Sequence, residues 1–379
     1  MTRPLAVALC DDFAEERWPS MDRVAGTLAA RLASAHRTRV EAARVCPPFV
    51  YAATRLPVLG AAAAAAKADR FLNRFWRYPH HASSLRDRFD LFHVVDHSYA
   101  HLVNALPAKR TVVTCHDLDA FRPLIEPDAD PRSGPFRSMT QRIATGLGRA
   151  AHVMCDTGAI AHDLVSARLA DPARVSVVPL GVDARFFMDE NGIDETGVDL
   201  LHVGSTVMRK RIDLLLRLFS AVAASEPTAR LIRIGDPLTD AQRQLARELQ
   251  IADRIVELRD VDEDTLVACY RRAVLVLQPS DREGFGLPVV EALASGTPVV
   301  ASDLPVLREV GGDAVTFCPA GDVDVWARTV SGLLRERAAC AAKWQARRQA
   351  GRDRARRFTW DRFADEVVRV YEQVAVASR

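Results

Sequence analysis

One stretch decides the fold: Gln278-Pro279-Ser280-Asp281-Arg282-Glu283-Gly284-Phe285-Gly286-Leu287-Pro288-Val289-Val290-Glu291. It follows a short apolar run, 273–277, which predicts a buried strand. Pro288 suits the first turn of a helix, and Gly296 suits its end. The segment therefore predicts a strand, a glycine loop and a helix, the place where doubly wound α/β folds bind ligands. Glu283 then stands on the loop and Glu291 about one turn into the helix, so both carboxylates can face one ligand.

Other motifs occur along the chain in a fixed order, and the set resembles the retaining glycosyltransferases of family 4, which have the GT-B fold. The stretch above resembles the Glu-x7-Glu motif of that family. Four further segments resemble its histidine strand, its turn before the interdomain linker, its diphosphate loop and the segment after the second glutamate: 112–117, 178–183, Val203-Gly204-Ser205 with Arg209-Lys210, and 294–303. The resemblance covers most of the chain and is strongest in its C-terminal half.

The resemblance implies an α/β protein with two Rossmann-like α/β/α domains that face each other across a cleft holding the active site. We expect an acceptor-side domain over 1–182, a nucleotide-sugar-binding domain over 183–357, and a C-terminal helix over 358–379 that crosses back to the first domain. The acidic stretch 189–199 is expected to be the linker. Apolar runs predict the strands, at 5–9, 91–95, 111–115, 152–155, 175–178, 200–204, 231–234, 255–258, 273–277, 298–301 and 314–317.

Composition narrows the class of protein. A chain of 379 residues has room for two domains, and a net charge of +2 gives no basis for nucleic acid as a general partner. The seven cysteines are scattered without a CxxC pair, which favours a reducing cytosol without a disulfide framework or zinc ribbon. The sequence has no apolar run approaching the roughly 20 residues that span a bilayer. We expect a cytoplasmic protein, with the inner face of the membrane as an alternative location.

The two glutamates and two adjacent basic residues carry the expected chemistry. The resemblance assigns Glu283 to the donor sugar and Glu291 to the ribose, and a carboxylate can accept two hydrogen bonds from a diol. It assigns Arg209 and Lys210 to the diphosphate, whose charge grows as its bond to the sugar breaks. From the residues alone, two solvated acids and a charged surface run remain the alternative. The expected donor-binding set is Arg209, Lys210, Gly204, Ser205, Gly284, Phe285, Gly286, Leu287 and Glu291.

No metal or cofactor is expected beyond the nucleotide sugar itself. Asp117-Leu118-Asp119 and Asp128-Ala129-Asp130 have the Asp-x-Asp form that holds a divalent ion in other glycosyltransferases. We interpret both as incidental, because GT-B enzymes usually neutralise the diphosphate with basic residues and a helix N-terminus.

The first domain offers histidines at predicted strand ends. His116 resembles the family histidine that reaches the donor sugar or contributes its backbone carbonyl, so we group it with Glu283 and Lys210 as catalytic. Asp117 is expected to orient it. A structural core histidine is the alternative.

A second histidine group lies on the preceding predicted strand and helix: His93, Asp96, His97 and His101. On one continuous helix its histidines would suit a metal. However, 91–95 predicts a strand and Ser98 a helix N-cap, so a role for His93 and His97 in the first-domain pocket is favoured over metal. Ser20 occupies the loop where relatives carry paired glycines. Either Ser20 serves the first-domain cleft there, or the loop is arranged differently from that of the family.

The segment 67–88 is both basic and aromatic. It could contact an anionic membrane, where a lipid-linked acceptor would lie. The alternative is a helix that packs its aromatic face on the core while its arginines face water.

The sequence therefore predicts a metal-independent retaining glycosyltransferase, a hexosyltransferase of polysaccharide or glycoconjugate synthesis. It would move a sugar from a GDP- or UDP-linked donor to a hydroxyl of a glycan or lipid-linked acceptor. The alternatives are a nucleotide-sugar epimerase of the same fold and a non-catalytic binding subunit. An oxidoreductase is disfavoured because no G-x-G-x-x-G follows a predicted strand.

Overall fold

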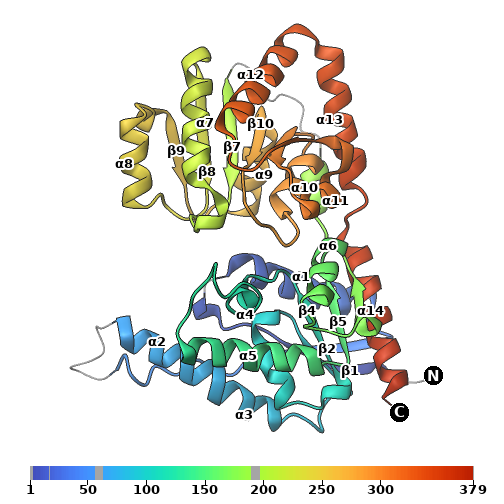
Figure 1. Ribbon diagram of the computed structural model, residues 1–379. Coiled ribbons are helices and arrows are strands. Elements are labelled where there is room, and N and C mark those ends of the chain that lie inside the picture. Colours follow the sequence, from blue (N-terminus) through green and yellow to red (C-terminus); the bar gives the residue numbers. More distant parts are fainter. Residues whose placement is uncertain (1–2, 17, 56–62, 189–196, 379) are drawn as a thin grey trace. The chain divides into compact units, whose positions relative to one another are not determined.

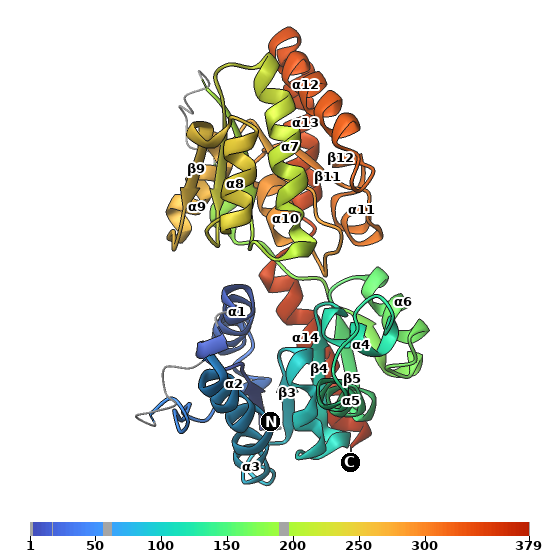
Figure 2. The ribbon, with the colours of Figure 1, turned by 60° about the vertical axis from the view of Figure 1, so that its left-hand side comes forward.

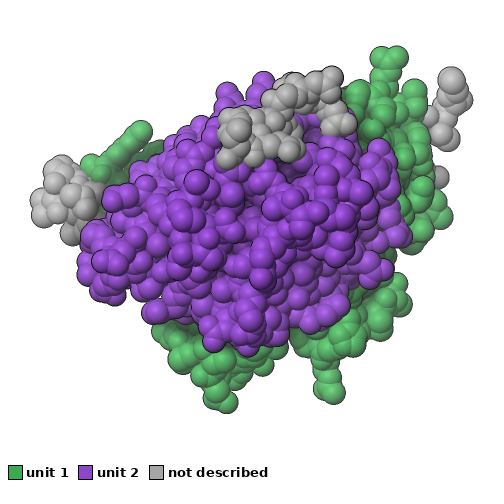
Figure 3. Space-filling model, turned by 90° about the horizontal axis from the view of Figure 1, so that it is seen from above, with its two compact units in different colours: residues 1–180, 360–379 green, residues 181–359 purple. Residues whose placement is uncertain are grey.

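The chain forms two compact units in the computed structural model (Figure 3). Each unit is built on one parallel sheet (Figure 1). Unit 1 comprises 1–180 together with 360–379, and unit 2 comprises 181–359. The structure describes residues 3–16, 18–55, 63–188 and 197–378. The linker was expected over 189–199, and residues 189–196 of it lie outside the described residues.

Unit 1 has a six-stranded sheet in the order β2-β1-β3-β4-β5-β6, with every pair parallel. The order reverses between β1 and β3, so ligands are expected at the carboxyl ends of these two strands. Both β3 and β4 are buried along their whole length, as the centre of a parallel sheet requires. The strands are β1 Leu5–Cys10, β2 Val40–Val45, β3 Leu91–Val94, β4 Thr111–Cys115, β5 His152–Cys155 and β6 Val175–Val177.

Helices cover this sheet, and one of them comes from the far end of the chain. The last helix, α14 (Trp360–Ala377), belongs to unit 1 and packs against α1 (Pro19–Ala35) (Figure 2). Its Glu372 accepts hydrogen bonds of 2.9 and 2.6 Å from the guanidinium of Arg39. The other helices are α2 Ala63–Leu72, α3 Tyr78–Ser83, α4 Arg122–Ile125, α5 Gly134–Arg149 and α6 Gly158–Ser166.

Unit 2 repeats the design with the sheet order β12-β11-β10-β7-β8-β9. The order reverses between β7 and β10, which pair in parallel through Leu275 and Leu200. The strands are β7 Val198–Val203, β8 Ala229–Ile234, β9 Ile255–Leu258, β10 Leu275–Gln278, β11 Val299–Ser302 and β12 Val315–Cys318. The helices are α7 Ile212–Ser225, α8 Asp240–Glu248, α9 Glu263–Arg272, α10 Leu287–Ala294, α11 Pro305–Gly311, α12 Val323–Ala339 and α13 Ala341–Ala355.

The fold class and the predicted strands are confirmed, with ends that differ by a few residues. Strand β2 was not predicted. It is one of the two edge strands of its sheet, and it lacks an apolar run because it carries Glu41 and Arg44. None of the helices in the described part of the chain is both long and apolar enough to cross a bilayer.

One helix glycine tests the packing between α5 and the 3-10 segment η3 (His97–Asn104), and a second glycine, on α12, serves as its control. A Cβ on Gly146 of α5 would lie 2.0 Å from the carbonyl oxygen of Ala100, whereas a Cβ on Gly332 of α12 would meet no atom within 4 Å. We expect Gly146→Ala to lower the denaturation midpoint. Gly332→Ala should raise stability by about 0.5–1 kcal/mol, since alanine is the better helix former. Denaturant unfolding of both variants checks this; equal effects would contradict the packing described.

Candidate functional site

In unit 2, three loops meet at the carboxyl edge of the sheet. They follow β7, β8 and β10, and the sheet order reverses between β7 and β10. A Cβ on Gly235, after β8, would lie 2.4 Å from the carbonyl oxygen of Gly204, after β7. The first two loops therefore touch through their glycines, which leaves no room for a side chain there.

Glu283 lies at the centre of this edge, on the loop that follows β10. Only 9% of the residue is exposed. Its Oε1 accepts a 2.7 Å hydrogen bond from the ammonium of Lys210 and another of 2.7 Å from the hydroxyl of Ser280. The side-chain amide of Gln278 donates to the same oxygen. Its Oε2 accepts a longer bond, 3.5 Å, from Arg209.

These partners keep Glu283 ionised. Burial is the largest single influence and acts to raise its pKa. The charges of Lys210 and Arg209, with the hydrogen bonds from Lys210 and Ser280, outweigh burial, so the pKa of Glu283 lies below its usual value. The carboxylate is therefore charged at neutral pH inside the protein.

The loop that carries Lys210 is locked to the loop that carries Glu283. The carbonyl of Arg209 accepts a 2.8 Å bond from the backbone N–H of Asp281. The guanidinium of Arg211, a residue in the left-handed conformation, pairs with the Asp281 carboxylate at 3.0 Å. The predicted diphosphate loop and the predicted glutamate loop thus form one structure.

Glu291 lies on α10, as predicted, and is buried. Its Oε2 accepts a 2.8 Å bond from the hydroxyl of Tyr270, whose own carbonyl accepts a 2.6 Å bond from Thr297. Tyr270 was not predicted, because it lies on α9, outside any motif. It fixes one oxygen of Glu291 and so sets the direction in which the carboxylate points.

The start of α10 depends on one glycine. Gly286 is the N-cap, with a φ of 91°, and a Cβ there would lie 2.7 Å from a methyl carbon of Leu307. Phe285 and Leu287 bury their side chains, and Phe285 packs edge-on against Phe358 with ring centroids 5.6 Å apart. Only their backbones, with that of Gly284, are left to serve a phosphate.

Two buried residues beneath the first loop were also missed. Arg233, on β8, donates to the carbonyls of Gly204 and Asp236 at 3.3 and 3.0 Å, and burial lowers its pKa to about 10. His202, on β7, is fully buried. Burial first, then Arg233 and Lys210, hold the pKa of His202 far below its usual value, so its ring is neutral. Strand positions of this kind carry no sequence motif.

Ser205, which belongs to the expected donor-binding set, is half-buried beside Gly204.

In unit 1, a polar cluster occupies the carboxyl edge of the sheet. His116 follows β4, and both of its ring nitrogens face acceptors: Asp156 Oδ2 at 2.7 Å and the Val95 carbonyl at 2.9 Å. A ring that donates twice is an imidazolium. Burial works against the charge, but Asp156 prevails and raises the pKa of His116 to about 10.

The partner of His116 corrects our prediction that Asp117 orients it. Asp156, at the end of the neighbouring strand β5, does so, while Asp117 lies 3.4 Å from Nε2 of His97. Because His116 and Asp156 each directly follow one of two adjacent parallel strands, strand order could have revealed the pair.

The remaining first-domain candidates are not all brought together. His97 lies with His116, at a ring distance of 6.4 Å. His93 is separate: it is buried between the hydroxyls of Tyr371 and Thr114, each 2.7 Å from a ring nitrogen. Ser20 is exposed in the first turn of α1. Within the described residues, no group of three or more potential ligands could hold a metal ion.

Comparison with known proteins accounts for both units. The model of Glycosyltransferase Family 4 matches residues 21–186, and that of Glycosyl transferases group 1 matches residues 183–354. The chain belongs to the group 1 glycosyltransferases of family 4. A curated relative, D-inositol 3-phosphate glycosyltransferase of Mycobacterium marinum, is 31% identical over 278 residues, 69% of this chain and 58% of the relative. The match thus spans little more than half of the relative's length.

Solved structures confirm the GT-B fold of this family member. Sucrose-phosphate synthase from Thermosynechococcus elongatus superposes with a TM-score of 0.71 at 19% identity, covering 99% of this chain and 100% of that one. Anabaena HepE, crystallised with UDP and glucose, superposes with a TM-score of 0.73 at 16% identity, covering 97% and 100%.

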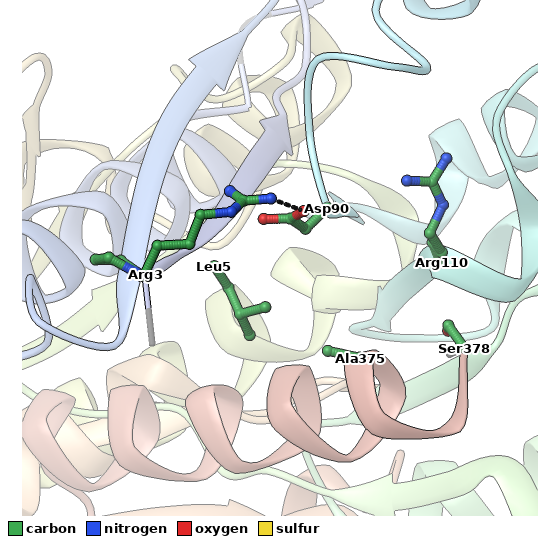
Figure 4. Close-up of a pocket in the computed structure, with 7 residues that line it drawn as sticks. Arg3, Leu5, Asp90, Arg110, Ala375 and Ser378 are labelled. Atoms are coloured by element: carbon green, nitrogen blue, oxygen red, sulfur yellow. Dashed lines mark hydrogen bonds and ion pairs between the residues drawn. The ribbon is translucent and has the colours of Figure 1, made fainter. Parts of the chain in front are cut away.

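A pocket of about 160 Å³ lies at the amino end of the unit 1 sheet, away from the polar cluster at its carboxyl edge (Figure 4). Its lining includes Arg3, Asp90 and Arg110, and Arg3 pairs with Asp90 at 2.7 Å. It opens beside the amino ends of β1 and β4, whereas ligands of open α/β sheets bind at the carboxyl ends. We therefore do not assign the donor to it.

We predict that His116 still carries both ring protons at about pH 8, a pH at which a histidine with the usual pKa of about 6.5 is mostly neutral. Because its folded pKa is raised, to about 10, its stabilising effect is complete below about pH 6.5 and is lost as the pH rises toward 10. Nitrogen-15 NMR of the ring checks this. His93, whose pKa burial lowers to about 3, should be neutral in the same spectrum. A single protonated nitrogen on His116 would contradict the assignment.

Proposed function

We propose that this chain transfers a hexose-type sugar from a GDP- or UDP-linked donor to a hydroxyl of a glycan or lipid-linked acceptor. One observation carries the proposal: the buried, ionised Glu283 with Lys210 and Arg209 around it at the strand switch point of unit 2. There, a carboxylate that accepts hydroxyl bonds lies beside cations that attract phosphate. A donor substrate needs both kinds of partner.

The two oxygens of Glu283 suggest how the donor sugar is bound. Oε1 already accepts from Lys210, Ser280 and Gln278, whereas Oε2 accepts the long bond from Arg209. A carboxylate oxygen can accept more than one bond, so Oε2 can take a sugar hydroxyl while Oε1 anchors the group. In the proposal, Glu291 accepts the ribose hydroxyls, with Tyr270 fixing its direction.

Arg209 and Lys210 would stabilise the departing diphosphate. Its negative charge grows as the bond to the anomeric carbon breaks, so fixed cations lower the barrier. Lys210 has three N–H donors and uses one of them on Glu283, so it can also donate to a phosphate oxygen. We propose that these residues and the start of α10 do this work without a metal ion, so EDTA should leave turnover unchanged.

We further propose retention of the anomeric configuration, by front-face displacement. The acceptor oxygen bonds to the anomeric carbon on the side from which the nucleotide leaves, and the hydroxyl proton passes to an oxygen of the departing phosphate. No enzyme nucleophile is required. His116 is the third proposed catalytic group; because its ring is bonded within unit 1, we assign this role to its backbone carbonyl.

Known proteins support particular substrates for testing. HepE was crystallised with UDP, which supports a UDP-linked donor, and the curated relative is named for D-inositol 3-phosphate. That compound is a soluble acceptor to test beside glycans and lipid-linked acceptors. Polysaccharide or glycoconjugate synthesis in the cytoplasm is the proposed setting.

Amide substitutions separate donor binding from chemistry. Glu291→Gln should weaken nucleotide binding about 10- to 100-fold, because it removes a charged hydrogen-bond acceptor. Glu283→Gln should keep nucleotide affinity within a few-fold and reduce turnover about 100-fold or more. Glu248→Gln, on the exposed face of α8, is the matched control. Unchanged nucleotide affinity in Glu291→Gln, or unchanged turnover in Glu283→Gln, would contradict these assignments.

Thermal unfolding with GDP, UDP, ADP and dTDP, each without metal, should identify the base. A nucleotide at about 100 times its dissociation constant stabilises by roughly 2.7 kcal/mol, which moves the midpoint visibly. We expect one of the four to act. An isomerised donor without acceptor product would indicate an epimerase, and binding without turnover would indicate a non-catalytic subunit.

A further inference from the structure

Helix α2 leads directly into the π-helical turn η2 (Asn73–Arg77) within unit 1 (Figures 1 and 2). The polar side chains of Asp69 and Asn73 in this segment are buried. Its buried row is Ala65, Asp69 and Asn73, at a spacing of four residues. Asp69 accepts the backbone N–H groups of Ala52, Ala53 and Thr54, at 2.9, 2.6 and 3.0 Å. Asn73 exchanges bonds of 2.9 and 2.8 Å with the backbone of Val50. The segment is thus attached to the protein by hydrogen bonds.

Several of its apolar residues lie on a neighbouring row that is exposed. Ala68, Phe71, Leu72 and Trp76 follow the spacing i, i+3, i+4 and i+8 of one helix face. Phe71 is 54% exposed, Leu72 36% and Trp76 73%. We name Phe71, Leu72 and Trp76 the outer stripe. The interpretation in which the aromatic face packs on the core holds for Tyr78, which is fully buried, and for Phe75, whose ring lies 4.6 Å from that of buried His101. It does not hold for Phe71 and Trp76, which are exposed.

Basic residues flank the outer stripe. Lys67, Arg70 and Arg77 are exposed on the same segment, and Arg86 and Arg88 are exposed shortly after it. Of the two carboxylates in 63–88, Asp69 is occupied by its backbone bonds, which leaves Asp87 at the surface. The exposed charged side chains of 63–88 are therefore mostly cationic.

We propose that the outer stripe docks in the headgroup region of an anionic lipid bilayer, with Lys67, Arg70 and Arg77 against the lipid phosphates. An exposed row of large apolar side chains marks an interaction site. Tryptophan at its tip and cations beside it match the membrane interface, where aromatic rings enter the headgroups and basic side chains meet anionic lipid. The docking needs no donor and would hold the proposed enzyme beside a lipid-linked acceptor.

Vesicle co-sedimentation of the full chain tests the proposal. We expect the chain to bind vesicles of phosphatidylcholine mixed with phosphatidylglycerol. Binding to vesicles of phosphatidylcholine alone should be weaker by about tenfold or more. High salt should weaken the binding to the mixed vesicles. Phe71→Ala with Trp76→Ala should lower binding about tenfold or more, as should Arg70→Glu with Arg77→Glu. Phe136→Ala, an exposed aromatic of α5 in the same unit, is the control and should bind as the wild type does.

Tryptophan fluorescence supplies a readout that folding defects do not mimic. Trp326, Trp344 and Trp360 are buried and Trp18 is partly exposed, so Trp76 should dominate a blue shift on adding mixed vesicles. Trp76→Phe should abolish the shift while keeping most of the binding. Wild-type protein that ignores mixed vesicles, or a double alanine variant that binds them equally well, would overturn the proposal. So would dimerisation through the stripe without vesicle binding.

This outcome is separable from the fate of the proposed function. Stripe variants should keep wild-type nucleotide binding and turnover on a soluble acceptor. Vesicle binding by a chain that binds no nucleotide would reject the sugar transfer and leave the docking surface intact.

Discussion

The ion pair between Lys210 and Glu283 is the constraint on which the rest of unit 2 depends. Two charges removed from water are costly, and losing one partner of such a pair typically destabilises a protein by about 3–5 kcal/mol. The chain therefore surrounds the pair with compensating contacts: Ser280 and Gln278 on one oxygen, and Arg209 on the other. Because Lys210 follows β7 and Glu283 follows β10, satisfying this pair also joins the two strands at the switch point of the sheet. The contacts that compensate for burying the Lys210–Glu283 pair also form the surface that is proposed to bind the donor.

Unit 1 solves a related problem with different residues. His116 and Asp156, at the ends of two adjacent strands, form its buried ion pair. At the switch point of its own sheet, burial and the nearby Asp96 raise the pKa of Asp12 to about 9, so that carboxyl group is protonated at neutral pH. Each unit thus gathers buried titratable groups at the carboxyl edge of its parallel sheet, the edge at which doubly wound folds bind ligands.

Most of the fold could be predicted because parallel strands in such a sheet are continuous apolar runs, and ten residues or more of helical pattern separate them. Strand β2, at one edge of its sheet, was not predicted, because polar residues at exposed positions interrupt the apolar run. In the site, Glu283, Glu291, Arg209 and Lys210 were found from motif and resemblance. Tyr270, Arg233 and Asp156 were not, because each acts through a contact made across the fold between positions that carry no local pattern. The two alternatives for the segment 67–88 stayed open for a related reason: spacing groups the aromatic and basic residues but does not show which of them turn inward.

Hydrogen–deuterium exchange with and without the stabilising nucleoside diphosphate tests the central claim most directly. If the donor site is built around the Lys210–Glu283 pair, the nucleotide should slow exchange in peptides covering 203–212 and 281–291 and leave the segment 63–88 unchanged. Protection confined to unit 1, or bound nucleotide without protection in either of those two segments, would contradict the account.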